Sequence, residues 1–246
     1  AKVTLGNGSV IETSGNKAYA VYANKTGEIQ LGNTAITTTG QNAHGLMAED
    51  GKITSGPTLC GWGSYPACVT STFEGGKIDL AGDTSVTVDA SKGSYAMLAS
   101  GTGSVIASQT SDGTETSGVY RITGDVVSNR AGQILLNAKG ASRFVGNVTS
   151  THADSLVQVA YADTTTNTGN ATASDSGVIR QDYTGNATGT GNLIAQTGGQ
   201  IALDMKDQST LSGNMTTDAT GTITGNLSGS STYTGSTDAS AGAPFP

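Results

Sequence analysis

An internal repeat of short strand-like segments constrains this chain more than any other feature. The segment Ala18–Ala23 (AYAVYA) returns as Ala43–Ala48 (AHGLMA) and again as Ser94–Ala99 (SYAMLA). The second step along the chain is about twice as long as the first, which fits one period and then two. A period in this range is typical of solenoids, in which stacked repeats bury a continuous core.

A glycine followed two positions later by isoleucine or valine recurs at intervals of about 19–29 residues, apart from one double step. Segments such as Glu28–Leu31 and Lys77–Leu80 alternate polar and apolar residues, as β-strands do. One coil of such strands cannot bury its own apolar side, so the next coil must stack on it at about 4.8 Å. The sequence therefore predicts an all-β parallel β-helix, a single rod of about ten coils over residues 1–246. The repeated glycines are Gly8, Gly27, Gly51, Gly76, Gly103, Gly132, Gly177, Gly199 and Gly221.

A second glycine pattern, Gly-Asn/Asp-apolar, indicates another stripe along the rod, at Gly124, Gly146, Gly213 and Gly225. Two other folds share some of these signals. A leucine-rich repeat has the same period, but its leucine triplets and asparagine ladder are missing. An antiparallel sandwich is also rich in threonine and glycine, but it does not need the same residue type to return once in every period.

Composition and charge exclude several classes of protein. Charged residues make up 13% of the chain, half the usual share of about 25%, and 36 of 246 residues are glycine. The net charge of −7 and the lack of a basic run exclude nucleic acid as a partner. The chain contains no stretch of 18 or more apolar residues, so the sequence predicts no membrane-spanning helix. The opening AKVTLGNGS is typical of a mature or trimmed N-terminus rather than of a signal peptide.

Four segments resemble the passenger domains of bacterial autotransporters, the later two those of pertactin-like adhesins. They are Asn42–Ala48 (NAHGLMA), Gly75–Leu80 (GGKIDL), Ser142–Val148 (SRFVGNV) and Ser209–Asn214 (STLSGN). The resemblance extends over most of residues 8–235 and implies a right-handed β-helix. It also implies export through the periplasm and an outer-membrane β-barrel that this chain does not contain, and adhesion at the bacterial cell surface. The partner would be a host surface glycan, an extracellular-matrix protein or a second rod in bacterial aggregation and biofilms.

The stretch CGWGSYPAC contains the only two cysteines and the only tryptophan. Because Gly51 and Gly76 lie one period apart, the sequence predicts that residues 57–73 replace part of a coil. In a chain that resembles an exported protein, Cys60 and Cys68 are expected to form a disulfide, which would stabilise this loop by about 2.5 kcal/mol. The loop is either a structural staple or a binding loop, with Trp62 and Tyr65 at its tip and Phe73 nearby.

Signatures of catalysis are weak. The chain has no Gly-x-Ser-x-Gly motif, no cofactor motif and too few ligands for a metal. The alternative to an adhesin is a polysaccharide-degrading β-helix enzyme, a lyase or hydrolase, with Asp79, Asp83 and Asp89 as its candidate carboxylates. The repeat places His44 in the wall of the coil with Tyr19 and Tyr95. His152 is expected in a solvated loop.

Three further expectations concern charge, surface and order. Glu28, Lys52 and Lys77 are predicted to stack as a ladder of alternating charge. Thr37–Thr39 and Thr222–Thr224 do not recur at one coil position, which argues against the threonine face of an ice-binding solenoid. Residues 163–174 are predicted to be the loosest region, because they contain no apolar side chain larger than alanine. Residues 236–246 are expected to form a flexible tail.

Overall fold

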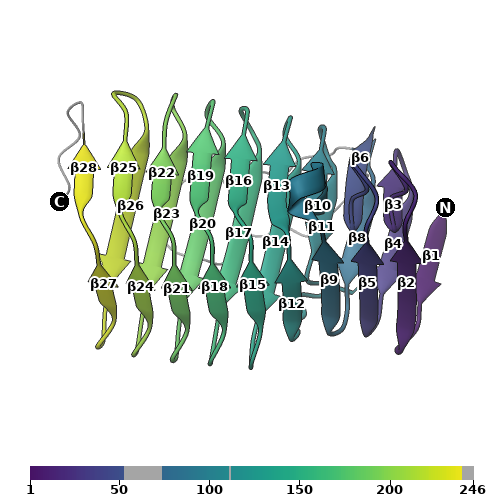
Figure 1. Cartoon of the computed structure of the whole chain (residues 1–246), viewed down its shortest axis with the longest axis horizontal. Coiled ribbons are helices and arrows are strands. Elements are labelled where there is room, and N and C mark those ends of the chain that lie inside the picture. The colour runs from purple at the N-terminus through teal and green to yellow at the C-terminus, as the bar shows by residue number, and fades with distance from the viewer. Residues whose placement is uncertain (53–73, 111, 240–246) are drawn as a thin grey trace.

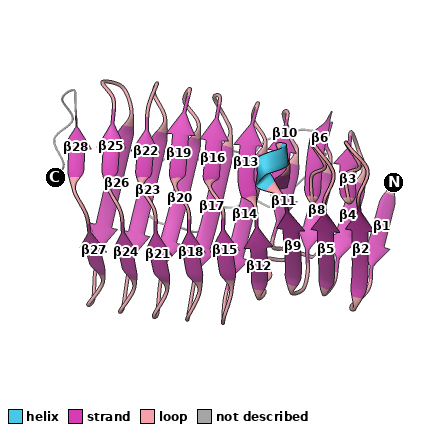
Figure 2. Cartoon of the chain, in the orientation of Figure 1, coloured by secondary structure: helices cyan, strands magenta, loops and turns pink. Residues whose placement is uncertain are grey.

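The computed structural model describes residues 1–52, 74–110 and 112–239, and these form a parallel β-solenoid (Figure 1). Three sheets, here named A, B and C, run along the rod, and each coil contributes one strand to each sheet. The sequence prediction of an all-β parallel β-helix is confirmed, with nine coils in the described residues where about ten were expected. The one described helix is the short η1 (Ala90–Lys92), drawn in cyan in Figure 2.

The strands follow one another around the coil in the order A, B, C. Sheet A contains β1 (Lys2–Leu5), β4 (Glu28–Leu31), β8 (Lys77–Leu80), β11 (Val105–Ala107), β14 (Gln133–Ala138), β17 (Leu156–Tyr161), β20 (Val178–Tyr183), β23 (Gln200–Met205) and β26 (Thr222–Leu227). Sheet B contains β2 (Ser9–Thr13), β5 (Thr34–Thr38), β9 (Thr84–Val88), β12 (Tyr120–Thr123), β15 (Arg143–Val145), β18 (Thr166–Thr168), β21 (Thr188–Thr190), β24 (Thr210–Ser212) and β27 (Thr232–Thr234). Sheet C contains β3 (Val21–Asn24), β6 (Leu46–Lys52), β10 (Tyr95–Ser100), β13 (Asp125–Asn129), β16 (Val148–Thr151), β19 (Ala171–Ser174), β22 (Leu193–Ala195), β25 (Met215–Thr217) and β28 (Thr237–Ala239), and β7 (Glu74–Gly75) pairs antiparallel with β6.

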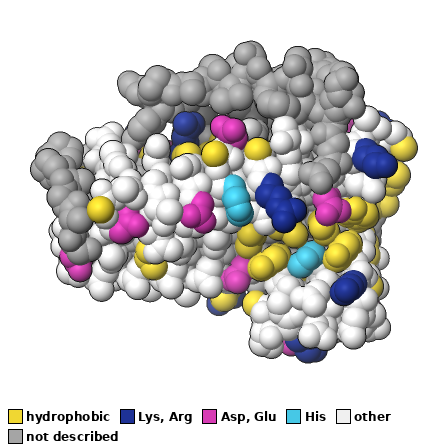
Figure 3. Space-filling view, turned by 90° about the horizontal axis from the view of Figure 1, so that it is seen from above, with side chains coloured by type: hydrophobic (Ala, Val, Ile, Leu, Met, Phe, Trp, Pro, Cys, Tyr) yellow, Lys and Arg dark blue, Asp and Glu magenta, His cyan; other side chains and the backbone are white. Residues whose placement is uncertain are grey.

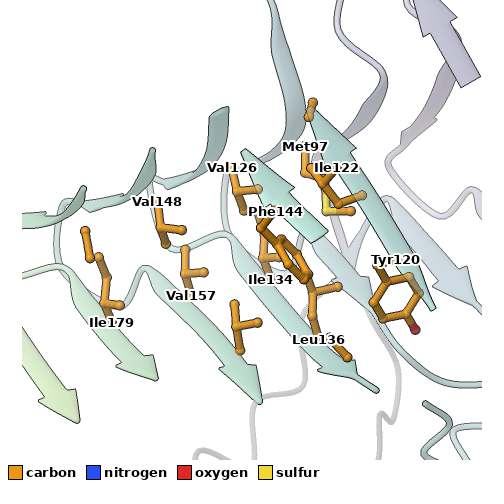
Figure 4. Packing of buried hydrophobic residues seen from close by; sticks show 14 of the residues in the cluster. Met97, Tyr120, Ile122, Val126, Ile134, Leu136, Phe144, Val148, Val157 and Ile179 are labelled. Atoms are coloured by element: carbon orange, nitrogen blue, oxygen red, sulfur yellow. The ribbon is translucent and has the colours of Figure 1, made fainter. Parts of the chain in front are cut away.

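The core consists of ladders of like side chains inside the coil. Alternate residues of each strand point inward, so equivalent positions of successive coils stack at about 4.8 Å. In sheet A, Ile78, Ile106 and Ile134 occupy one such ladder, and each is fully buried. Figure 4 shows inward side chains of all three sheets meeting in one cluster. Burying each large aliphatic side chain stabilises the fold by about 1.5–3 kcal/mol. Apolar residues at alternate positions of each strand are therefore enough to form the core.

The structure confirms the pairing of the three AYAVYA-like segments but corrects their spacing. Val21 pairs with Leu46, and Leu46 pairs with Met97, so the three segments are adjacent strands of sheet C. The longer step along the chain, from Leu46 to Met97, is therefore one coil and not two. In sheet A, likewise, Glu28 pairs directly with Lys77.

The prediction that residues 57–73 replace part of a coil concerns a segment outside the described residues, and it stays a prediction. Coil two already has its three strands, β4, β5 and β6, before this segment begins. Residues 53–73, which contain the two cysteines, lie in the chain between β6 and β7. Gly51 misled the count because it lies in β6 of sheet C, while the other glycines of its series from Gly27 onward precede sheet A strands.

The expected ladder of Glu28, Lys52 and Lys77 is corrected for the same reason. Lys52 belongs to β6, in a different sheet from the other two. Glu28 instead lies between Lys2 and Lys77 in sheet A, and Lys2 Nζ is 3.4 Å from Glu28 Oε1. Charges of alternating sign therefore do stack in sheet A, with Lys2 in place of Lys52.

Residues 163–174 are not a loose region, contrary to the prediction. They contain β18 and β19, and each pairs with a strand on both sides. The inward side chains Asn167, Ala171 and Ala173 are buried. Small side chains suffice here because the hydrogen-bonded ladders on both sides hold the backbone. The predicted tail is also partly wrong, since 237–239 form β28, while 240–246 lie outside the described residues.

An asparagine ladder closes the corner between sheets B and C. Oδ1 of Asn147 accepts a hydrogen bond from the backbone N–H of Asn170 at 3.0 Å. The same bond joins Asn170 to Asn192 and Asn192 to Asn214, both at 2.8 Å. Each bond ties one coil to the next, so the ladder helps to keep the neighbouring strands of sheet B in register.

A glycine precedes each of these asparagines because the coils approach closely at this corner. A Cβ on Gly191 would lie 2.0 Å from the carbonyl oxygen of Gly169. Gly124, Gly146 and Gly213 of the second glycine stripe belong to this corner, whereas Gly225 lies in β26 of sheet A.

Candidate functional site

The predicted binding loop lies outside the described residues. Its members are Cys60, Trp62, Tyr65, Cys68 and Phe73, and the expected disulfide and the expected ligand contacts remain predictions. The candidate site below is therefore built from the described part of the rod.

The three candidate carboxylates occupy different parts of the coil. Asp79, in β8, is fully buried, and its Oδ1 accepts a hydrogen bond from Gln109 Nε2 at 2.9 Å. Asp83 lies at the corner between sheets A and B and accepts the backbone N–H of Val119 at 2.8 Å. Asp89 caps η1 by accepting the N–H of Ser91 at 3.1 Å. Each carboxylate has a local structural role, and the three do not converge on one face.

His44 lies where the repeat predicted it. Its ring stacks between those of Tyr19 and Tyr95, with ring centroids 5.1 and 5.0 Å away. Its Nδ1 accepts the backbone N–H of Tyr95 at 3.0 Å, and burial lowers its pKa. His152 is exposed in a turn, as expected.

A second, smaller apolar cluster lies on the outer side of sheet C. Met47, Leu98 and Val127 stack in neighbouring coils and are 6–8% exposed. Figure 3 shows hydrophobic side chains gathered toward the N-terminal end of the rod, beside a histidine. Tyr19 and Tyr95 of the aromatic stack pack against this cluster, which is buried although it lies outside the coil.

The most regular surface is the outer face of sheet B in the last four coils. Two outward positions of each strand carry threonine or serine, and all eight side chains are exposed. The register stacks them into two rows, since Thr166 pairs with Thr188, Thr188 with Thr210 and Thr210 with Thr232. The threonine rows, as we call them, are Thr166, Thr188, Thr210 and Thr232 in one row and Thr168, Thr190, Ser212 and Thr234 in the other.

None of the eight hydroxyl groups hydrogen-bonds to another residue of the described chain. Neighbours within a row are about 4.8 Å apart, and the two rows are separated by about 6.6 Å along each strand. The rows therefore present a flat, uncharged grid of unused donors and acceptors.

The sequence prediction missed this grid. Thr-x-Thr or Thr-x-Ser recurs with a constant period at Thr166, Thr188, Thr210 and Thr232, at one coil position. The prediction examined Thr37–Thr39 and Thr222–Thr224, which lie in different sheets, and concluded that no ladder existed. A search at the shorter, constant period of the C-terminal half would have found it.

Two hollows lie on the described part of the rod. A hollow beside Gln109 and Asn137 has a volume of about 20 Å³, room for one water molecule. A shallow hollow of about 240 Å³ opens on sheet B beside Ser85 and Arg121. In the same part of the chain no three His, Cys, Asp or Glu side chains gather as a metal site would require. No described helix has the length and hydropathy to cross a membrane.

Comparisons of the chain with protein-family models, with curated proteins and with solved structures each gave no match. The proposal of function below therefore depends on the repeat motifs, the fold and the chemistry of the outer faces.

Proposed function

We propose that this chain is the passenger of a bacterial autotransporter and acts as an adhesin at the cell surface. The observation that carries the proposal is the pair of threonine rows on sheet B. A solenoid places equivalent side chains at regular intervals along its axis, so such a face can form many similar weak contacts with an extended partner.

The chemistry of the threonine rows suits adhesion. Each hydroxyl can donate and accept a hydrogen bond, and each such bond contributes only about 0.5–1.5 kcal/mol. Affinity would then come from the number of contacts made at once, and contact would remain reversible. The partner classes are a host glycan, an extracellular-matrix protein and a second rod.

An enzyme is the less well supported alternative. Polysaccharide lyases and hydrolases need carboxylates that converge on one substrate. Asp79 is buried, whereas Asp83 and Asp89 hold backbone N–H groups at two different corners.

The test displays the chain on beads or on non-aggregating bacteria and measures clumping and attachment to glycan and matrix-protein arrays. Thr188→Lys with Thr210→Lys places two bulky charges in the middle of one row. Thr149→Lys with Thr172→Lys makes the same change on the outer face of sheet C and serves as the control. We expect the first pair to reduce clumping or attachment to background and the control pair to leave it unchanged.

Other outcomes would change the proposal in defined ways. Loss of adhesion only in Trp62→Ala/Tyr65→Ala would assign binding to residues 53–73 in place of the rows. A wild-type chain that neither clumps nor attaches to any array would overturn the adhesin function.

The same rows support a second candidate function, binding to ice. A flat grid of threonines at fixed spacing in two directions can hold water molecules in an ordered layer. If this is the function, wild-type chain will separate the freezing and melting points of a small ice crystal, and Thr188→Lys/Thr210→Lys will abolish the gap. Equal freezing and melting points for wild type would exclude it.

A further inference from the structure

Two arginines stack on the outer face of sheet B, in the middle of the rod. Arg121 in β12 and Arg143 in β15 are register partners, so their Cα atoms are about 4.8 Å apart. Both side chains are exposed. The chain contains only four arginines, and two of them are neighbours here.

This pair has no internal charge partner. Neither guanidinium forms an ion pair with any of the described residues. Like charges directly opposite each other on neighbouring strands destabilise a sheet. The fold therefore gains nothing from the pair, although acidic residues outnumber basic ones in the chain by 19 to 12.

The carboxylates nearest in the coil are occupied with the backbone. Asp83 accepts a hydrogen bond from the backbone N–H of Val119 at 2.8 Å. Asp125 accepts one from Asn147 at 2.7 Å, and Asp163 accepts one from Gly140 at 2.9 Å. Among the outward positions of the described sheet B strands, the one acidic side chain is Glu12, three coils before Arg121. The outward positions in the middle of this face thus carry two positive charges and no acidic side chain, while Asp83 lies at the edge of the face.

The surroundings of the pair are suited to a sugar chain. Ser85 and Thr87 lie on the preceding strand, and Thr166 and Thr168 lie on the following one. The hollow of about 240 Å³ opens beside Arg121, and its lining includes Ser85 and Asp83, whose carboxylate accepts the N–H of Val119. Hydroxyl groups on both sides can exchange hydrogen bonds with sugar hydroxyls, and the hollow gives room for a ring.

We propose that Arg121 and Arg143 anchor a binding site for an acidic polysaccharide. A guanidinium presents a planar fork of N–H donors that matches a carboxylate or sulfate group in a two-bond arrangement. Two forks one coil apart engage acidic groups on one extended chain lying along the rod axis. The threonine rows continue the contact toward the C-terminal end. This inference depends on the proposed adhesin function, for which it names the chemical class of the partner.

The test measures binding of purified chain to immobilised heparin, which is sulfated, to polygalacturonate, which carries carboxylates only, and to neutral dextran. We expect binding to at least one acidic polymer and none to dextran. Arg121→Gln/Arg143→Gln should weaken it at least tenfold. Arg121→Lys/Arg143→Lys keeps the charge and loses the planar fork of donors. Its affinity should lie between those of wild type and of the glutamine variant. Unchanged circular dichroism and melting temperature would show that the variants are folded.

The matched control is Lys17→Gln/Arg130→Gln, which removes two positive charges from exposed turns. We expect it to retain binding. Equal loss in the control and the arginine variant would overturn the site, because binding would then follow net charge. No binding of wild type to either acidic polymer would also overturn it.

The two proposals fail separately. The displayed rod could clump or attach to the arrays while the purified chain binds neither acidic polymer. This result would refute the arginine site and leave the adhesin function in place. The chain could instead bind an acidic polymer through the two arginines and mediate no adhesion when displayed. This result would refute the adhesin function and leave the arginine site in place.

Discussion

Asp79 is an outward-facing residue of sheet A that is nevertheless fully buried. Lys77 Nζ lies 3.2 Å from its Oδ1, and Gln109 donates to the same oxygen. Its Oδ2 has no hydrogen-bond partner among the described residues. Burial therefore outweighs these two favourable contacts and raises the pKa of Asp79 to about 6.

This raised pKa predicts that mild acid stabilises the fold. A free aspartate has a pKa of about 3.9, so between the two values the folded chain holds a proton that the unfolded chain has released. The free energy of unfolding should thus rise as the pH falls from 7 to 5. Asp182, whose pKa burial and Asp204 also raise to about 6, adds to the trend.

Asp79→Asn should remove much of this pH dependence and stabilise the chain at pH 7 by about 2–3 kcal/mol, because the pKa is raised by roughly two units and each unit corresponds to 1.36 kcal/mol. Urea unfolding at pH 7 and pH 5 measures both effects. Asp154→Asn, a change in an exposed turn, is the control and should behave as wild type. An unchanged pH slope in Asp79→Asn would show that another group titrates.

At the scale of the element, the corners between sheets keep the coils in register. Sheet B strands of the last four coils have only three residues each, too short to fix their own alignment. The asparagine ladder beside them supplies one additional bond per coil. The regular spacing of the threonine rows depends on this corner.

Asn192→Ala should lower the free energy of unfolding by about 1–2 kcal/mol, because the backbone N–H of Asn214 loses its acceptor. Asn192→Asp keeps an oxygen in place and should lose less, as Asp125 makes the same bond to Asn147 in an earlier coil. Chemical denaturation measures both. Equal losses in the two variants would mean that the hydrogen bond is not the cause.

At the scale of the whole molecule, the described coils before and after residues 53–73 stack directly on each other. Lys52 and Glu74, which flank this segment, are paired residues of β6 and β7. Neighbouring coils are joined there by β4 with β8 and by β6 with β10. Folding of the rod should therefore not require residues 53–73.

Replacing residues 53–73 by Asn-Gly should leave a cooperative rod whose melting temperature lies within about 4 °C of wild type. Deleting residues 163–174, which removes β18 and β19, should by contrast break the ladders and abolish the cooperative transition. Thermal unfolding followed by circular dichroism compares the two. A collapse of the first variant would indicate that the segment completes a coil after all.

The sequence by itself determined the class of fold and several positions within it. The alternation in Glu28–Leu31 and the repeat around His44 are local patterns, and a coil that stacks on copies of itself translates them directly into strands and ladders. Such patterns survive because each strand meets the same kind of neighbour.

Only the tertiary structure decided how the repeats pair and what the surface presents. The step from Glu28 to Lys77 is a single coil. No local pattern distinguishes one long coil from two short ones until the hydrogen-bonded partners are known. The threonine rows and the Arg121–Arg143 pair arise in the same way. Their members are a full coil apart along the chain, and only stacking of successive coils, one strand spacing apart, makes them one face.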